Sequence, residues 1–355
     1  MFIEFGYIYK IRNTLFVVIL SLLILVTLSS CANHKVVYYI NNTDLEEKEI
    51  KLQREIIINE MANASRLLHK IGWLILKENT NNCSKSKKDA FGFIFAHVND
   101  LPDNSKKYFY AANKNWDKLR KNYDPNFPII ISIAPNSPTS LAGFKEGDRI
   151  VSINEEYSSK NIRQAITKAS NSKNDITMSV LRGDQEYKRK ITGQEICSFN
   201  IQPLAAGAPN AFADGKKIYI TIAAIKLAES DDEIAFLIGH ELAHNILHFS
   251  GKGLAEAQTL PISYQDKPSI RSVNDIFVLQ STRKETEADI EGIKYAHKAG
   301  YNLKKASDYW RRLSIFNPNM VSDDHSLIYK GNAFRASTID AIIKDLNYNN
   351  NNVLE

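Results

Sequence analysis

Dense blocks of lysine and arginine are absent from this sequence of 355 residues. Its 45 lysines and arginines against 40 aspartates and glutamates leave a formal net charge of only +5, spread along the chain. We therefore predict no nucleic-acid partner, because such proteins gather basic residues on one face or in one run. Apolar residues are not scarce: with 44% hydrophobic and 24% charged residues, the composition is that of a globular protein long enough for two or three cores.

Long apolar runs are also absent, apart from one near the N-terminus. Lys10 and Arg12 precede the run LFVVILSLLILVTLSSC, whose apolar part of roughly fifteen residues is too short for a typical membrane span. A basic flank, a short apolar stretch and small residues at its end predict a secretory signal peptide over residues 1–30. An uncleaved anchor helix is the alternative, because the segment before the run is long and contains Glu4. Either interpretation places the rest of the chain outside the cytoplasm.

The apolar run ends in LSSC, whose cysteine is Cys31. This end resembles the lipobox of bacterial lipoproteins, in which cleavage falls before a cysteine whose thiol carries diacylglycerol. The resemblance implies lipidation of Cys31, a membrane anchor through the acyl chains and a tether over residues 31–43. Ala32 follows the cysteine, where an aspartate is the inner-membrane retention signal of enteric bacteria. The resemblance therefore favours the outer membrane.

Two different regions fill residues 44–127. Residues 44–78 carry apolar side chains at helical spacing, among them Ile50, Ile57 and Leu68, and predict one or two helices that partly belong to the domain after residue 195. Residues 79–127 are rich in asparagine, lysine, aspartate and serine, with aromatic residues in FGFIFAHV and YFY. Their pattern assigns no element and leaves open whether they form a lid.

The pattern of residues 128–195 predicts, in order, a strand, a turn with a short helix, a strand, a helix, a strand, a hairpin and a strand. Gly143 and Gly147 supply turn geometry that a side chain would hinder, and Gly183 fits a tight hairpin. The segment resembles a PDZ domain of the bacterial kind. The resemblance implies a β-sandwich or barrel that binds an extended peptide at a sheet edge beside the helix near 160–169; a spacer or an intramolecular contact is the alternative. The matching positions are Ser137-Pro138, Ala142-Gly143, Gly147-Asp148-Arg149-Ile150, Ile153-Asn154 and Arg182-Gly183-Asp184.

Cysteine is scarce, with three residues in the whole chain. If Cys31 is lipidated, Cys83 and Cys197 remain as a possible disulfide in an oxidising compartment. Two buried free thiols are the alternative, because the sequence gives no Cα separation. Cys83 precedes the PDZ-like segment and Cys197 follows it, and the ends of a domain often lie close together. We therefore predict that the PDZ-like domain is inserted into a domain whose first helix comes from residues 44–78.

The stretch GHELAHNILHF holds the residues best suited to chemistry. Ser230 and Glu233 form a capping box, and the almost wholly apolar sequence that follows predicts a helix buried in a core. His240 and His244 share one face of that helix at i and i+4, so both imidazoles can bind one zinc ion, with Glu241 as general base. Burial of these groups is costly unless something pairs with them. Core histidines satisfied by hydrogen bonds are the alternative to a metal site.

A catalytic zinc needs a third protein ligand, and His248 is unsuitable. A helix rises about 1.5 Å per residue, so His248 lies about 12 Å along the axis from His240. The metzincin pattern H-E-x-x-H-x-x-G-x-x-H fails as well, because Leu247 stands in place of its glycine and Ser250 in place of its last histidine. The third ligand must come from elsewhere in the chain.

The downstream segment STRKETEADIEGIKYAHKAG contains the best candidate. Glu285, Asp289 and Gly292 fall on one face of the predicted helix, at i, i+4 and i+7. We predict Glu285 as the third zinc ligand, and Asp289 as the acceptor of the free N–H of a ligand histidine. Gly292 is predicted to allow close packing between the two helices, and Glu287 to face solvent. The alternative is a plain charged helix, since acidic residues at this spacing usually form a solvated face.

Three motifs, NAFADG (Asn210–Gly215), HELAH and ETEADIEG, together resemble the minigluzincin metallopeptidases. This is the family of the CAAX prenyl proteases, HtpX and the BepA-like enzymes, and the likeness is strongest to its secreted, PDZ-bearing bacterial members. The resemblance runs from about residue 197 to 345. It implies an edge strand in KKIYITIAAI, near residues 216–222, against which substrate lies extended. The family's zinc ligands, general base and supporting aspartate correspond to His240, His244, Glu285, Glu241 and Asp289.

One departure from the family pattern concerns a His-Pro pair followed by an arginine. This chain has His325-Ser326 and then Arg335, so the proline is missing. In BepA-like relatives this histidine can approach the zinc as part of a plug over the site, which makes His325 and Arg335 candidate site contacts. An ordinary loop residue is the alternative for His325. The chain also lacks the multiple hydrophobic spans of HtpX and the prenyl proteases, so it is not an integral membrane peptidase of that kind.

The sequence therefore predicts an α+β protein. A mainly helical zincin-type peptidase domain with a small sheet occupies residues 196–347, the PDZ-like domain precedes the zinc motif, and residues 348–355 form a disordered tail. We expect a metalloendopeptidase with one Zn²⁺ per chain, lipid-anchored in the cell envelope and facing the periplasm or exterior. Its expected substrates are extended or misfolded envelope proteins that the PDZ-like domain selects or presents. The alternative is a lipid-anchored peptide-binding or chaperone module whose peptidase site is latent.

Overall fold

The chain divides into two compact units, Met1–Glu49 and Ile50–Glu355, and the features described below belong to the second, apart from the first turns of one helix. The predicted signal peptide, Cys31, the predicted tether up to residue 42 and His325 lie outside the described residues. Within the described ranges, no helix is long and apolar enough to cross a membrane. The computed structural model describes residues 43–83, 86–101, 103–106, 127–157, 159–249, 282–316, 318–322 and 331–351.

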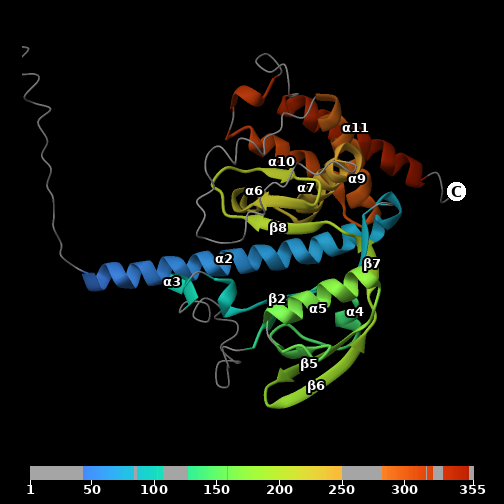
Figure 1. Ribbon diagram of the computed structural model, residues 1–355. Helices are drawn as coiled ribbons and strands as arrows, with labels where there is room; N and C mark the ends of the chain where they lie inside the picture. The colour runs from blue at the N-terminus through green and yellow to red at the C-terminus, as the bar shows by residue number, and fades with distance from the viewer. Residues whose placement is uncertain are drawn as a thin grey trace, which may run out of the picture. The chain divides into compact units, whose positions relative to one another are not determined.

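Five strands form an antiparallel sheet: β2 (Phe93–Ala96), β3 (Ile129–Ile133), β4 (Arg149–Ile153), β5 (Ile176–Arg182) and β6 (Gln185–Ile191), in that order. The helices α4 (Pro138–Leu141) and α5 (Ser159–Ser172) lie between strands in the sequence (Figure 1). From residue 128 onward the elements follow the predicted order. Among the described residues β2 and β6 are the edges of a single sheet whose apolar face α5 covers, so neither the second layer of a sandwich nor a closed barrel is seen there. Ile162 of α5 is buried in one cluster with Ile150 and Met178 of the strands.

The two flanks of this segment meet. β1 (Lys87–Ala90) pairs antiparallel with β7 (Gln194–Cys197), and β2 also begins upstream of residue 128, so the sheet is larger than the PDZ-like segment. Cys83 and Cys197 form a disulfide with a Cα–Cα distance of 5.5 Å. Both cysteines are buried, at 3% and 0% exposure. The disulfide therefore joins the points where the chain enters and leaves the five-stranded sheet.

A second, three-stranded sheet has the order β8-β10-β9. Its strands are β8 (Asn200–Leu204), β9 (Ala211–Ala213) and β10 (Lys217–Thr221), with β10 parallel to β8 and antiparallel to β9. The predicted edge strand near 216–222 is therefore wrong: β10 is the central strand, and β9 is at the edge. Ile218, Tyr219 and Ile220 are all buried, and such a continuous buried run is typical of a strand covered on both faces.

The helices that follow are α6 (Ile222–Leu227), α7 (Asp231–Ala243), α9 (Thr282–Lys298), α10 (Ala306–Leu313) and α11 (Asn332–Asn351). A π-helical turn, η4 (His244–His248), continues α7. Ser230 caps α7, because its Oγ accepts a hydrogen bond from the Glu233 backbone N–H at 3.3 Å. Every residue from Glu233 to Ala243 is buried, and α9 packs along α7 with α10 and α11 beside them (Figure 1). α11 continues to Asn351, so residues 348–351 are helical where a disordered tail was predicted, since each residue added to a nucleated helix adds a hydrogen bond. Residues 352–355 lie outside the described part of the chain.

α2 (Thr43–Glu78) is a single helix, and it contacts both sheets. At Gly72 it meets β8 so closely that an added Cβ would lie 2.2 Å from Ile201 Cδ1. Its His69 Nδ1 lies 2.9 Å from Ser132 Oγ of β3. Leu68 of α2 belongs to the buried core that also contains α7 and α9. The first helix and the site helices therefore share one buried core.

The remaining short elements are η1 (Thr80–Asn82), η2 (Val98–Asp100), α3 (Asp103–Lys106), η5 (Leu303–Lys305) and η6 (Pro318–Met320).

Candidate metal centre

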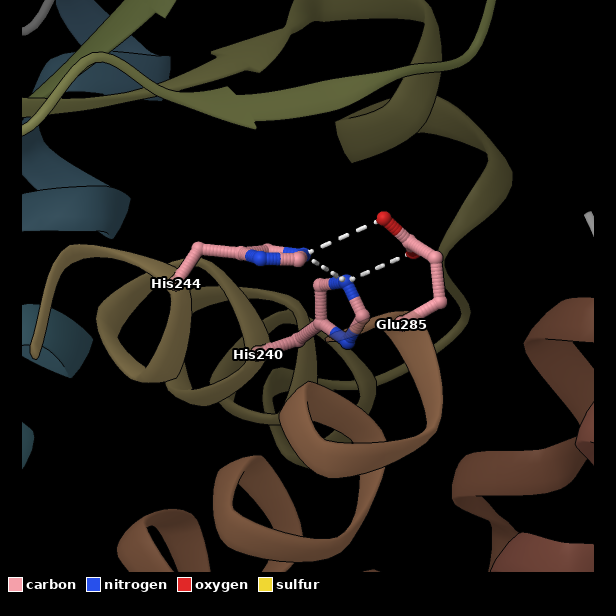
Figure 2. A group of neighbouring side chains, drawn as sticks. All are labelled: His240, His244 and Glu285. Carbon is pink, nitrogen blue, oxygen red and sulfur yellow. Dashed lines mark hydrogen bonds and ion pairs between the residues drawn. The ribbon is translucent and has the colours of Figure 1, made fainter. Parts of the chain in front are cut away.

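Two histidines and one glutamate converge between α7 and α9 (Figure 2). The Nε2 atoms of His240 and His244 lie 3.0 Å apart. Glu285 of α9 faces both, with Oε2 at 3.5 Å from His240 Nε2 and Oε1 at 3.4 Å from His244 Nε2. One ligand atom from each residue lies within 4.8 Å of the other two. Two imidazole nitrogens and one carboxylate in this arrangement fit the donor set of a catalytic zinc site.

The three side chains are almost fully enclosed, with exposures of 6% for His240, 5% for His244 and 11% for Glu285. Burial disfavours the charged imidazole, yet hydrogen bonds with Asp289 and Glu285 raise the pKa of His240 to about 10. Burial likewise opposes ionisation of Glu285, but its two histidine partners hold its pKa well below the usual value. A metal ion bound between these ligand atoms would take the place of the proton that the metal-free site favours on the imidazole.

Close packing of α7 on α9 brings these groups together. A Cβ added at Gly239 would lie 2.3 Å from the Gly292 carbonyl oxygen, and one added at Gly292 would lie 2.6 Å from the His240 backbone nitrogen. Neither distance is possible between real atoms, so both positions require glycine at this helix spacing. The close packing predicted for Gly292 is confirmed, and Gly239 is its counterpart on the other helix.

Asp289 and Arg335 hold His240 on the Nδ1 side of its ring, away from Nε2. Asp289 Oδ1 lies 2.9 Å from His240 Nδ1. Arg335 of α11 donates two hydrogen bonds to the same carboxylate, from Nη2 to Oδ1 at 2.6 Å and from Nε to Oδ2 at 2.9 Å. Its guanidinium lies 3.6 Å from the centre of the Trp310 ring. Burial raises the pKa of Asp289, but Arg335 and His240 outweigh it and hold that pKa below its usual value. Asp289 is thus an acceptor that keeps the His240 proton on Nδ1 and leaves Nε2 for a metal.

Glu241 follows His240 directly in α7, and only 5% of the residue is exposed. Burial raises the pKa of its carboxyl to about 7, although the neighbouring His240 charge opposes this shift. A carboxyl group that titrates near neutral pH can take up a proton in one step and release it in the next. Its position and environment suit the general base predicted from the motif.

His248 is not a metal ligand, as predicted, but it contacts Glu287, which was not predicted. The structure leaves His248 outside the group of three ligand atoms. Its Nε2 lies 3.2 Å from Oε2 of Glu287, whose side chain is 40% exposed. Glu287 is thus partly exposed to solvent, in line with the prediction, and it also pairs with His248, which was not predicted. The helical spacing placed Glu287 away from Glu285 correctly, but it gave no information about the π turn that carries His248 towards α9.

Asn245 is a site residue that the sequence reasoning missed. It is buried at 3% exposure, with Oδ1 accepting from the Gly215 N–H at 2.7 Å and Nδ2 donating to the Lys217 carbonyl oxygen at 3.1 Å. These bonds tie the end of the histidine-bearing helix to the turn between β9 and β10. A polar residue directly after HELAH, inside an apolar helix, was the available signal, because buried amides are normally hydrogen-bonded.

Comparisons with known proteins agree with this geometry. Residues 188–338 match the family model described as Peptidase family M48, and this segment contains all the residues of the candidate metal centre. The chain is also similar to the mitochondrial metalloendopeptidase OMA1 of Saccharomyces cerevisiae, with 26% identity over 123 residues, or 32% of this chain and 36% of that protein. It thus spans about a third of the length of this relative. The fold, the site and these two findings together support a metallopeptidase of the zincin type.

A solved structure of a PDZ domain is similar to part of the chain. It is the HtrA3 PDZ domain bound to a phage-derived ligand, with 19% sequence identity, covering 31% of this chain and 88% of that one. The TM-score is 0.24, and a likeness of that size carries no conclusion about the fold. The PDZ-like nature of the five-stranded sheet therefore stays a prediction from the sequence.

Proposed function

We propose that this protein is a zinc-dependent metalloendopeptidase that hydrolyses peptide bonds in extended polypeptides. One observation carries the proposal: His240, His244 and Glu285 converge at the buried contact of two helices, and Glu241 directly follows His240 in the same buried helix. Surface acidic clusters are common without a metal, but two histidines and two glutamates are not enclosed together unless they are paired. Hydrogen bonds among these side chains offset part of the cost of burying them, and a bound cation would offset the remaining negative charge.

Each residue of the metal site has a separate role in the proposed hydrolysis. A zinc ion held by His240, His244 and Glu285 supplies a Lewis acid for the scissile carbonyl and the attacking water. Glu241 accepts a proton from that water and delivers it to the leaving amine. Asp289 holds His240 in the orientation and tautomer that direct Nε2 towards the metal.

We place the substrate beside β9, the edge strand of the three-stranded sheet. An extended peptide can add to a sheet edge through main-chain hydrogen bonds. β9 and β10 both pack against α7, and Asn245 fixes the turn between them to the helix that carries the histidines. This replaces the location predicted near residues 216–222, whose strand already has a neighbour on each side.

We further propose a cell-envelope location with a lipid anchor at Cys31, and misfolded or unassembled envelope proteins as substrates. The lipobox-like end of the N-terminal apolar run supports the anchor, and the disulfide supports an oxidising compartment. The five-stranded sheet would select or present substrate at the edge of β2, next to α5. Arg163 of α5 lies 4.3 Å from the centre of the Phe95 ring of β2, so helix and edge strand are neighbours, as peptide addition beside the helix requires.

Degradation of casein tests the proposed reaction. The full chain would be compared with Glu241→Gln, which keeps the size of the side chain and removes the base. Glu291→Gln is a matched control, because Glu291 lies in α9 and pairs with Lys294 at the surface. The proposal predicts cleavage by the wild type and the control and its loss in Glu241→Gln. Equal activity in all three would contradict the mechanism, and zinc binding without cleavage in any of them would favour the latent, peptide-binding alternative.

A further inference from the structure

His248 is enclosed without serving as a metal ligand. Its side chain is 5% exposed, and it ends the π turn that continues α7. The turn is closed by a hydrogen bond from the Phe249 N–H to the His244 carbonyl oxygen at 3.2 Å, five residues apart in place of the usual four. π turns are rare and are frequently found at functional sites. This one brings the ring of His248 to 5.1 Å from the ring of His244.

The hydrogen bonds around His248 form a chain that leads away from the candidate metal centre. His244 Nδ1 lies 2.9 Å from His248 Nδ1, and His248 Nε2 lies 3.2 Å from Glu287 Oε2. One assignment of protons satisfies every contact. His244 keeps Nε2 free for a metal and donates from Nδ1 to His248 Nδ1, and His248 donates from Nε2 to the Glu287 carboxylate.

We propose that His248 and Glu287 are positioning residues for the metal centre, which hold His244 in place as Asp289 holds His240. The proposal rests on the metal site of the proposed function. It gives each ligand imidazole a hydrogen-bond acceptor at Nδ1: a carboxylate for His240, and for His244 a second imidazole backed by a carboxylate. Both carboxylates, and the third ligand itself, come from α9, so one helix sets the orientation of the whole donor set. Acceptors of this kind raise the basicity of a ligand histidine and fix its ring.

Two substitutions at His248 separate a hydrogen-bonding role from simple packing. In His248→Leu the acceptor for His244 is lost while an apolar side chain fills the space. In His248→Asn the amide oxygen stands near the former Nδ1 position and can still accept. Glu287→Ala removes the outer carboxylate, whose side chain is 40% exposed, and circular dichroism would check that this variant is folded. Glu291→Ala, at the surface of the same helix, is the control.

Zinc affinity, measured on the full chain by competition with a chromophoric chelator, is the readout, together with the visible absorption of the cobalt-loaded protein. We expect His248→Leu to lower zinc affinity roughly tenfold to a hundredfold and to change the cobalt spectrum. His248→Asn should recover most of that loss, and Glu287→Ala should lower affinity several-fold. Wild-type affinity in His248→Leu or Glu287→Ala, or equal losses in the leucine and asparagine variants, would overturn the proposal. A wild type that binds no zinc would instead refute the proposed function, so the two failures are distinct.

Discussion

Substituting Gly292 by alanine tests the contact that assembles the site. Judged from the sequence alone, alanine in the middle of a helix stabilises by about 1 kcal/mol relative to glycine. The structure predicts the opposite sign. The added Cβ would lie 2.6 Å from the His240 nitrogen and 2.7 Å from its Cα, both backbone atoms of a buried helix. To reach ordinary contact, α9 must move from α7 by roughly 0.8 Å, and overpacking of this kind costs about 1–3 kcal/mol.

The predicted result for Gly292→Ala is a net loss of up to about 2 kcal/mol in the free energy of unfolding, after the gain in helix propensity is subtracted. Zinc affinity should fall at least tenfold as well, because the same movement draws Glu285 from the histidines. Urea unfolding of the metal-free protein and chelator competition measure the two effects. Gly207→Ala is the matched control, since no atom lies within 4 Å of its added Cβ. A Gly292→Ala protein as stable as the wild type, with unchanged zinc affinity, would refute the reasoning.

Three further predictions concern the supports of the fold. Arg335→Met leaves the Asp289 carboxylate buried without its two hydrogen bonds and should lower the unfolding free energy by about 3–5 kcal/mol; a loss below 1 kcal/mol in urea unfolding would contradict this. Replacing both disulfide cysteines by serine removes a cross-link between residues 114 apart and should lower the unfolding free energy by about 4–5 kcal/mol. The thermal midpoint should fall, and an unchanged midpoint would contradict this. Burial, and to a smaller extent Lys70, lowers the pKa of His69 to about 4. The unfolded chain therefore binds a proton first as the pH falls, and stability is lost between about pH 6.5 and 4, by at most about 3 kcal/mol. His69→Gln should flatten this part of the stability profile, and an unchanged profile would count against it.

The parts of the site that lie on single helices could be predicted from the sequence. The i and i+4 spacing of His240 and His244, and of Glu285 and Asp289, follows from the geometry of one helix. The structure places all four on the faces expected, and Gly292 meets the other helix as predicted. Helix periodicity carries this information because it is local and needs no knowledge of distant partners.

Features that depend on distant pairing could not be predicted in the same way. The strand at Lys217–Thr221 is central because β8 and β9 pair with it, and nothing in its own residues states the order of the sheet. β2 also belongs to the five-stranded sheet, but it lies within residues 79–127, to which the sequence pattern assigned no element. The π turn at His244–His248 adds a residue to the helical repeat, so a search for α-helical spacing misses the approach of His248 to Glu287.

Zinc stoichiometry tests the central claim most directly. We expect close to one zinc ion per chain for the wild-type protein and for the Glu291→Ala control, measured by elemental analysis after exchange against dilute chelator. We expect a large loss of bound zinc in Glu285→Ala, which removes the only ligand supplied by α9. A wild-type chain without zinc, or a Glu285→Ala chain that retains a full equivalent, would contradict the assignment of His240, His244 and Glu285 as the metal site.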